Sequence, residues 1–360
     1  MKKYISVILL LSLLCTLFSG CGSKKDATDK KTDKDKATSS VVSQAPQFVV
    51  NPLTGLENLS PDKANVRPVA VMVNNLTTAQ KVQTGLDKAD IVYETYVEAG
   101  ITRLLAVYKD VASVGQIGTI RSARYSYVDL ANGHDALYVH AGIDGAYCEP
   151  YANKVSDHIN LIAGAPSASY FREKNGLSKE HTLYSTGEKI LSAMGSMKRR
   201  TTVKEAYNTP WVSFNSAESP ATPTNKLADG TLVKTVTVPM SGSYTTQFIY
   251  DETAKEYYRT RKGTAHTDYK TGSKVSVKNI FVLFTTVTPF PDNYHVKEHL
   301  DSGSGYYVSD GGYEEIQWKK GATSDKFVFT KADGSVLNVN AGQSWVFIAN
   351  QNIKSGVKFQ

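Results

Sequence analysis

The sequence predicts an α+β protein, with an α/β sandwich-like N-terminal domain over residues 47–212, a connection at 213–230 and a mostly β C-terminal domain over 231–360. Up to about residue 210, short runs of β-branched and aromatic residues alternate with helical patterns. Beyond it, the chain reads as strands and turns, and prolines with small polar residues gather in the connection. No repeat with a period of about 20 to 50 residues is present, which excludes solenoids and propellers.

The N-terminus has the pattern of a lipoprotein signal. Two lysines precede an apolar run over residues 5–18, and Ser19-Gly20 stands directly before Cys21. The run is shorter than the roughly 20 apolar residues that a membrane-spanning helix needs. We therefore expect residues 1–20 to be removed as a signal peptide, and Cys21 to become the lipidated first residue of the mature chain. The alternative is a secreted protein in which Cys21 has no such role.

Residues 21–46 are expected to form a disordered tether between the lipid and the folded part. They contain a run of lysine, aspartate and small polar residues over 24–40, which offers too little apolar surface to offset the cost of ordering the backbone. Cys15 leaves with the signal and Cys21 carries the lipid, so Cys148 is the one thiol left for the fold and no disulfide is expected. The expected location is extracytoplasmic, anchored to the cell membrane through Cys21.

The net charge argues against nucleic acid as a partner. The formal charge of the whole chain is +7, but two lysines belong to the signal and the tether holds six lysines against four aspartates. The folded part is left near +3, which is too small for an electrostatic footprint of nucleic-acid binding.

Two strands and a hairpin are expected early in the chain. Residues 68–75 and 89–100 are rich in β-branched and aromatic residues, and the second run continues into another strand pattern after Ala99-Gly100. We favour a hairpin there. The acids at 87, 90, 94 and 98 have spacings of three and four, so they could alternatively form one face of a helix.

Helix signals occur at two places, and further strands follow. Ser122 is a candidate N-cap for a helix that ends at Gly133, and Ser185 to Glu188 reads as a capping box. Residues 135–142 read as a buried strand. In the second half, Asp333-Gly334 is the strongest hairpin signal.

Several segments of the chain are specific enough to point to a family. They are PLTGL (52–56), RPVAVMVNN (67–75), IGTIRSARYSYVDLA (117–131) and YVHAGIDG (138–145) in the first half, and GYYVSDGGYEEIQWKKG and ADGSVLNVNAGQSWVFI in the second. These segments resemble the YerB-like lipoprotein family, a bacterial family of unknown function with an N-terminal and a C-terminal conserved block. The resemblance covers nearly all of residues 50–350. It implies a lipoprotein with an α/β first domain and a mostly β second domain, and it transfers no activity, substrate or catalytic residue.

The densest cluster of charged and polar residues lies in the first domain and predicts a site for an anionic group. Two guanidinium groups placed before a helix start could hold such a group together with backbone N–H donors. The alternative is that these arginines pair with Glu94, Glu98 or Asp129 in a structural network, and that the histidine is a buried, hydrogen-bonded one. The candidate ligand-binding residues are Arg103, Arg121, Ser122, Arg124, His140 and Asp144.

No catalytic residue, metal site or cofactor is predicted, because HExxH, GxSxG and P-loop patterns are absent from the sequence. The leading hypothesis is a non-enzymatic envelope module that binds a cell-wall polymer or an envelope protein. The alternative is an enzyme acting on anionic lipid-linked cell-wall glycopolymers, suggested by a loose likeness of residues 102–124 to LytR-CpsA-Psr phosphotransferases.

Overall fold

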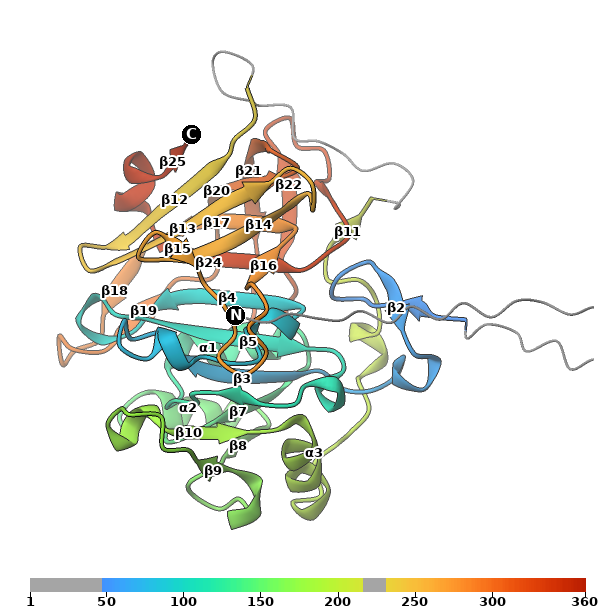
Figure 1. Ribbon diagram of the computed structural model, residues 1–360, viewed down its shortest axis with the longest axis vertical. Coiled ribbons are helices and arrows are strands. Elements are labelled where there is room, and N and C mark those ends of the chain that lie inside the picture. Colours follow the sequence, from blue (N-terminus) through green and yellow to red (C-terminus); the bar gives the residue numbers. More distant parts are fainter. Residues whose placement is uncertain (1–46, 216–230) are drawn as a thin grey trace, which may run out of the picture. The chain divides into compact units, whose positions relative to one another are not determined.

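In residues 47–215 and 231–360, which the computed structural model describes, ten strands form one mixed sheet (Figure 1). In sheet order the strands are β22 (Val328–Lys331), β21 (Gly312–Lys319), β20 (Ser302–Ser309), β17 (Asn279–Thr285), β24 (Ser344–Asn350), β4 (Ile91–Tyr96), β5 (Thr102–Tyr108), β3 (Val69–Asn74), β7 (Leu137–His140) and β8 (His158–Asn160). Six of them, β17, β24, β4, β3, β7 and β8, run in one direction, and β5 runs against its neighbours β4 and β3. The carboxyl ends of these six strands therefore lie at the same edge.

The N-terminal and C-terminal parts of the chain are interleaved in this sheet. β24 pairs in parallel with β17 on one side and with β4 on the other, so a late strand lies against an early one. Residues 46–360 form a single compact unit. The predicted signal, the tether and residues 216–230 of the predicted connection lie outside the described residues, so the predicted division of the chain stays a prediction. No helix within the described residues is long and apolar enough to cross a membrane.

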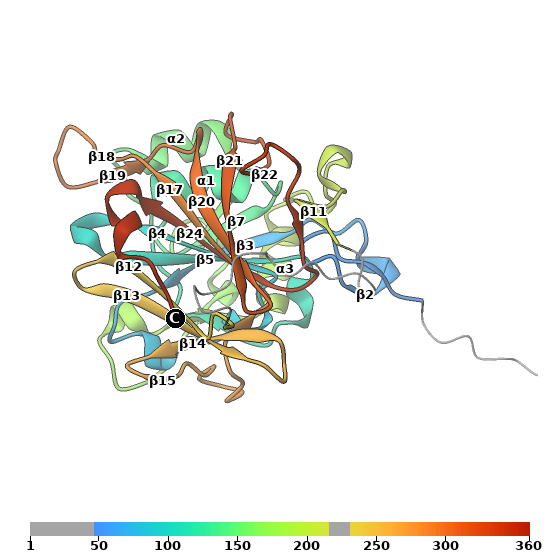
Figure 2. The ribbon, with the colours of Figure 1, turned by 90° about the horizontal axis from the view of Figure 1, so that it is seen from above.

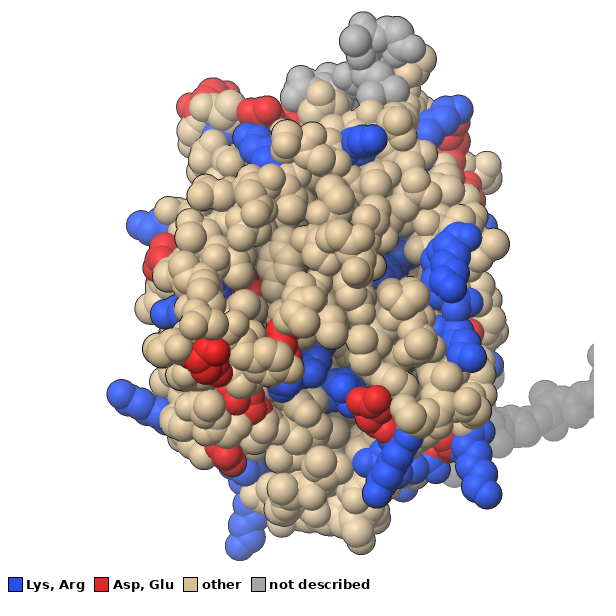
Figure 3. Space-filling model, turned by 90° about the vertical axis from the view of Figure 1, so that its left-hand side faces the viewer, with Lys and Arg blue, Asp and Glu red and all other residues tan. Residues whose placement is uncertain are grey.

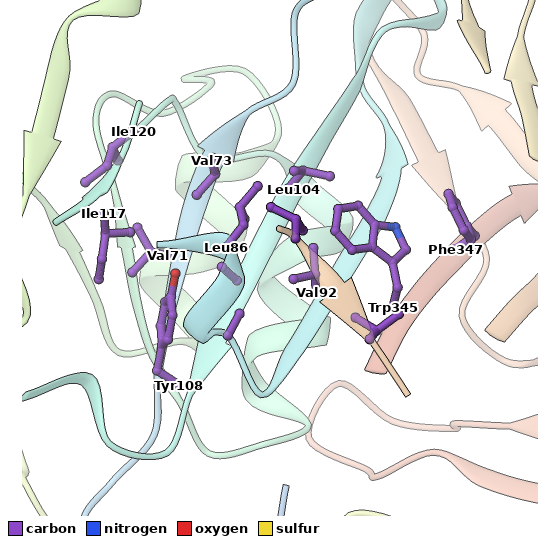
Figure 4. Close-up of a cluster of buried hydrophobic side chains, with 14 of the residues drawn as sticks. Val71, Val73, Leu86, Val92, Leu104, Tyr108, Ile117, Ile120, Trp345 and Phe347 are labelled. Carbon is purple, nitrogen blue, oxygen red and sulfur yellow. The ribbon is translucent and has the colours of Figure 1, made fainter. Parts of the chain in front are cut away.

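The large sheet is covered on both faces (Figure 2). Helices α1 and α2 lie on one side of it and the strands of a six-stranded sheet on the other. Alternate residues of β3 point to opposite faces, as the period of a strand requires: Val71 and Val73 belong to one hydrophobic cluster and Met72 to the other. Figure 4 shows the first cluster, in which Trp345 of β24 packs near Val92 and Leu104 and Phe347 lies beyond Trp345.

The remaining elements surround these layers. The helices are α1 (Tyr125–Asn132), α2 (Cys148–Val155) and α3 (Gly187–Ser196). The six-stranded sheet consists of β12 (Thr235–Ser241), β13 (Tyr244–Asp251), β14 (Glu256–Arg261), β15 (Thr264–Ala265), β16 (Ser276–Val277) and β25 (Lys358–Phe359). Smaller sheets contain β6 (Ile117–Gly118), β9 (Phe171–Arg172) and β10 (Leu183–Ser185); β1 (Val49–Val50) and β2 (Glu57–Leu59); β11 (Ser213–Phe214) and β23 (Asn338–Val339); and β18 (Val287–Pro289) and β19 (Val296–Glu298).

The predicted α+β class is confirmed, and so is the hairpin around Ala99-Gly100. β4 and β5 pair antiparallel, and both turn residues adopt positive φ angles, 56° at Ala99 and 69° at Gly100. The helical alternative for this segment is therefore wrong. β7 is buried along its whole length, as expected, and the turn at Asp333-Gly334 is present, with φ 83° at Gly334 and a hydrogen bond from Lys331 N to Ser335 O of 2.8 Å.

The predicted capping residue is wrong by two positions for α1 and by one position for α3. Ser122 does not cap α1: the helix begins at Tyr125, and the Ser122 hydroxyl instead donates to the Ala141 carbonyl at 3.1 Å. The reason is that the chain is still extended at Arg124 (φ −137°, ψ 158°). α3 is capped by Thr186, whose hydroxyl accepts from Lys189 N, because Ser185 belongs to β10. The predicted end of α1 at Gly133 is confirmed.

Candidate functional site

The structure brings all six predicted ligand-binding residues to the edge where β3, β7 and β8 end. Arg103 stands at the start of the antiparallel β5, and His140 ends β7. Arg121 and Ser122 lie on a segment that crosses the end of β3, where Arg121 N donates to Met72 O at 3.0 Å. Ligands of open α/β sheets bind at the carboxyl ends of the strands. Figure 3 looks onto the side where β18 and β19 leave the end of β17, and side chains of both charges gather in its lower half.

Arg124 is used in an ion pair inside the protein. Its Nε lies against Glu98 Oε1, and its Nη2 donates to Glu98 Oε2 at 3.1 Å. Burial opposes ionisation of Glu98, but the hydrogen bonds and charge of Arg124 outweigh it and hold the pKa of Glu98 below its usual value. His295, from the turn between β18 and β19, reaches the same place, with Nε2 3.5 Å from Glu98 Oε1 and 3.2 Å from Asp144 Oδ1.

The side chains of Asp144 and His140 form hydrogen bonds that hold neighbouring segments in place at this edge. The Asp144 carboxylate accepts hydrogen bonds from the backbone N–H groups of residues 146–148, at the start of α2. These donors outweigh partial burial and lower the pKa of Asp144. His140 Nδ1 lies 2.7 Å from Gly142 O and Nε2 lies 2.9 Å from His158 Nδ1. Burial lowers the pKa of His140 to about 3, so its ring is neutral at physiological pH.

Arg103 is a buried cation behind the edge. It is 7% exposed, and its Nη1 donates to the Ser122 carbonyl. Burial and the nearby charge of Arg124 lower its pKa to about 10, so it remains mostly protonated at neutral pH. Glu94 does not neutralise it. That carboxylate is buried in the core and accepts from Asn75, Thr102, Thr246 and Trp345.

Arg121 and Ser122 line an open cleft of about 340 Å³, which we call the Arg121 cleft. Three cations and one carboxylate face it, so its charged side chains carry a positive excess of two. Its polar lining comes from Arg121, Ser122, Arg172, Lys179 and Glu180, and its apolar lining from Ile120, Ala141, Ile162 and Leu183.

The cations of the Arg121 cleft are only partly neutralised. Arg121 Nη2 lies 3.1 Å from Glu180 Oε2, but the Glu180 side chain is 53% exposed, and the buried Arg121 Nε has no hydrogen-bond partner. Arg172 donates to the Lys179 carbonyl at 2.6 Å and to the Thr182 hydroxyl at 3.2 Å. Neither Arg172 nor Lys179 pairs with a carboxylate of the described residues. The cleft therefore offers guanidinium and ammonium donors to an anion from solvent.

Sequence reasoning missed Arg172, Lys179 and His295. Arg172 and Lys179 come to the cleft because β10 pairs with both β6 and β9, which places a segment some 50 residues later beside Arg121. No local spacing signals that proximity. His295 depends on the β18–β19 pair folding back against α1 and α2, which is also a long-range contact.

Two other cavities lack this chemistry. An apolar groove of about 360 Å³ lies between the β4–β5 turn and the β12–β13 turn, and no charged residue is among its lining residues. A cavity of about 250 Å³ lies at the opposite edge, beside Val66 and Val111, with Asp62, Lys63 and Asp110 in its wall. Within the described part of the chain, no group of three or more His, Cys, Asp or Glu side chains is arranged to hold a metal ion. The Cys148 thiol is buried, which raises its pKa to about 12.

Comparison with known proteins gives consistent matches in sequence and fold. Two family models match this chain: "Protein of unknown function (DUF3048) N-terminal domain" over residues 53–200 and "Protein of unknown function (DUF3048) C-terminal domain" over residues 236–346. YerB of Bacillus subtilis (strain 168), whose name proposes a lipoprotein, is 29% identical over 349 residues, which is 97% of this chain and 96% of YerB. The crystal structure of YerB from Bacillus subtilis superposes with a TM-score of 0.73 at 27% identity, covering 87% of this chain and 99% of that one.

Proposed function

Since this chain belongs to the DUF3048 family and is similar to YerB, whose name proposes a lipoprotein, we propose that it is a lipid-anchored extracytoplasmic module that binds a phosphate-bearing component of the cell envelope in the Arg121 cleft. The anchor is the lipid on Cys21, which the signal pattern before that residue supports. The name of YerB supports the same reading. The module acts by binding rather than by catalysis.

The observation that carries the proposal is the positive excess of the Arg121 cleft at the carboxyl edge of the sheet. Arginine presents planar, paired donors that match phosphate oxygens, and lysine adds a mobile point charge. Arg121 and Arg172 come from different elements, so the fold holds two guanidinium groups beside one opening. A phosphate monoester carries about −1.5 to −2 charges at neutral pH, which matches the excess of two.

Binding is favoured over catalysis by what surrounds the cleft. The Ser122 hydroxyl already donates to the Ala141 carbonyl, so it is not poised as a nucleophile. The buried neutral His140 is engaged on both ring nitrogens. The alternative, an enzyme acting on lipid-linked glycopolymers, then becomes an outcome of the same test.

The test uses the chain from Gly22 onward, which contains the whole unit 46–360. Its melting temperature is measured against increasing phosphate, diphosphate and poly(glycerol phosphate), for the wild type, Arg121→Ala and the exposed control Lys319→Ala on β21. A ligand at a hundredfold excess over its Kd stabilises the folded state by about 2.7 kcal/mol. We expect the melting temperature of the wild type and of the control to rise with ligand concentration, and that of Arg121→Ala to stay constant. No rise in the wild type with any of the three would overturn the proposal, and release of phosphate from diphosphate or polymer would favour the enzyme.

A further inference from the structure

The Arg121 cleft has an apolar wall next to its cations. Four of its nine lining residues are Ile120, Ala141, Ile162 and Leu183. A site for free phosphate needs no such wall, because inorganic phosphate has no apolar surface to bury.

Ile162 is the apolar residue at the mouth of the cleft. It is 48% exposed, whereas its neighbour Leu161 is buried. Ile162 is thus an exposed aliphatic side chain beside three cations. A ligand that covers this side chain gains binding free energy from the buried apolar surface, while the cations neutralise the charge of the ligand.

The size and openness of the cleft limit how much of a ligand it can take. Ligand pockets that enclose whole small molecules start at about 300 Å³. An open cleft of about 340 Å³ therefore holds a phosphate head group and the first part of a chain, while a longer chain continues outside.

We propose that the ligand of the Arg121 cleft is a terminal phosphate or diphosphate carried on an apolar chain, with Arg121 and Arg172 holding the phosphate and Ile162 covering the chain. This inference rests on the proposed function and narrows its ligand class. The positive excess of two favours a terminal phosphate over a phosphodiester, because a diester carries a single negative charge. Isoprenoid phosphates and phosphatidic acid share this chemistry, and both are membrane lipids that a lipid-anchored protein can reach.

The test compares the affinity of the chain from Gly22 onward for four probes: diphosphate, farnesyl diphosphate, farnesol, and vesicles containing phosphatidic acid. Titration calorimetry gives Kd for the soluble probes, and co-sedimentation measures vesicle binding. The variants are the wild type, Ile162→Gln, and Val328→Gln as a matched control, since Val328 is an exposed apolar residue on β22 that is not part of the cleft.

We expect farnesyl diphosphate to bind at least about tenfold more tightly than diphosphate, a gain that covering part of an apolar chain supplies. Ile162→Gln should remove most of that gain, because it should raise the Kd for farnesyl diphosphate by a larger factor than the Kd for diphosphate. Val328→Gln, outside the cleft, should change neither Kd. Binding to farnesyl diphosphate but not to vesicles identifies an isoprenoid source. Binding to phosphatidic acid vesicles that Ile162→Gln weakens identifies a glycerolipid source.

Three results would overturn the inference. Equal affinity for diphosphate and farnesyl diphosphate would show that the apolar wall is unused, with the proposed function intact. Equal affinity for farnesol and farnesyl diphosphate would show that the phosphate groups do not contribute to binding in the cleft. If neither diphosphate nor farnesyl diphosphate binds, the proposed function itself is overturned.

Discussion

Arg124 holds the buried Glu98 through two of its guanidinium nitrogens, whereas Arg121, three residues earlier, reaches only the exposed Glu180. The side chains are 19% exposed for Arg124 and 7% for Glu98, so this pair is largely removed from water. The two arginines that stand together in the sequence therefore have different roles. Arg124 belongs to the scaffold and Arg121 to the Arg121 cleft.

Substitution should separate these roles in stability. Arg124→Ala leaves the carboxylate of Glu98 buried without its ion partner, and we expect a loss of about 3 kcal/mol in the free energy of unfolding. Arg121→Ala removes a contact to an exposed carboxylate, and we expect a change of less than about 1 kcal/mol. Urea denaturation of the chain from Gly22 onward measures both.

A second substitution checks the cause. Adding Glu98→Gln to Arg124→Ala removes the uncompensated charge, so the double variant should be more stable than Arg124→Ala alone. A larger loss for Arg121→Ala than for Arg124→Ala would show that the assignment of the two arginines is reversed.

The interleaved sheet predicts that the two parts of the chain stay together when the connection is cut. A protease site is inserted between residues 216 and 230, and the cleaved protein is run on a sizing column in native buffer. Because β24 pairs with both β17 and β4, we expect the two fragments to elute together and to separate only in denaturant. Separate elution in native buffer would mean that this strand arrangement does not hold the parts together.

Asp87, which lies beside the ionised Asp268, should make stability fall as the pH rises. The Asp87 side chain is buried and lies beside Asp268, and its one cationic partner among the described residues is Lys88, whose Nζ is 3.7 Å from Asp87 Oδ2. Asp268 accepts from Thr84 Oγ1 at 3.0 Å and from Gly85 N at 2.6 Å, among others, which keeps it ionised. Burial, and then the charge of Asp268, raise the pKa of Asp87 to about 6 from an ordinary value of 3.8.

The raised pKa of Asp87 determines the direction in which stability changes with pH. The folded state binds the proton of Asp87 more tightly than the unfolded state, so its contribution is fully present below about pH 4 and is lost as the pH rises through 6. Asp87→Asn keeps a neutral donor toward Asp268 and should be more stable than the wild type at pH 7 by on the order of 2 to 3 kcal/mol, with little advantage at pH 4. The exposed control Glu57→Gln should show no such trend. Parallel pH profiles for wild type and Asp87→Asn would contradict this assignment.

The proposed lipid anchor on Cys21 predicts a direct labelling result. Cells fed labelled palmitate should incorporate it into the wild type, and Cys21→Ser should abolish the label and release the protein into the medium. Cys148→Ser is the matched control and should keep the label, since Cys148 is a buried thiol of the folded part. Unchanged labelling of Cys21→Ser would show that Cys21 is not the lipidated residue.

The strands were predictable because their signal is local. The runs that became β3, β4 and β7 alternate or stay apolar over a few residues, and the turns after β4 and β7 carry Gly or Ala with positive φ. The strand order was not predictable. Trp345 lies opposite Val92 in the sheet, and nothing within either strand specifies a neighbour some 250 residues away.

The site was predictable in composition and not in detail. The cluster of arginines in residues 103–124 did come to one edge, but the expected helix start at Ser122 would have put Arg121 just before the helix and Arg124 in its first turn. The chain is extended at Arg124, and in an extended chain residues three apart point to opposite sides. That one change sends Arg124 to Glu98 and leaves Arg121 facing the cleft.

The most direct test of the central claim is the Kd for diphosphate of Arg172→Ala, measured by titration calorimetry beside the wild type and Lys319→Ala. Arg172 joins the Arg121 cleft only through the pairing of β9 with β10, so this variant tests the folded cleft rather than the run of arginines in the sequence. The account predicts saturable binding at one site in the wild type and the control, and a loss of at least about tenfold in Arg172→Ala, the scale of one charge-assisted hydrogen-bonding group. An unchanged Kd in Arg172→Ala would contradict it.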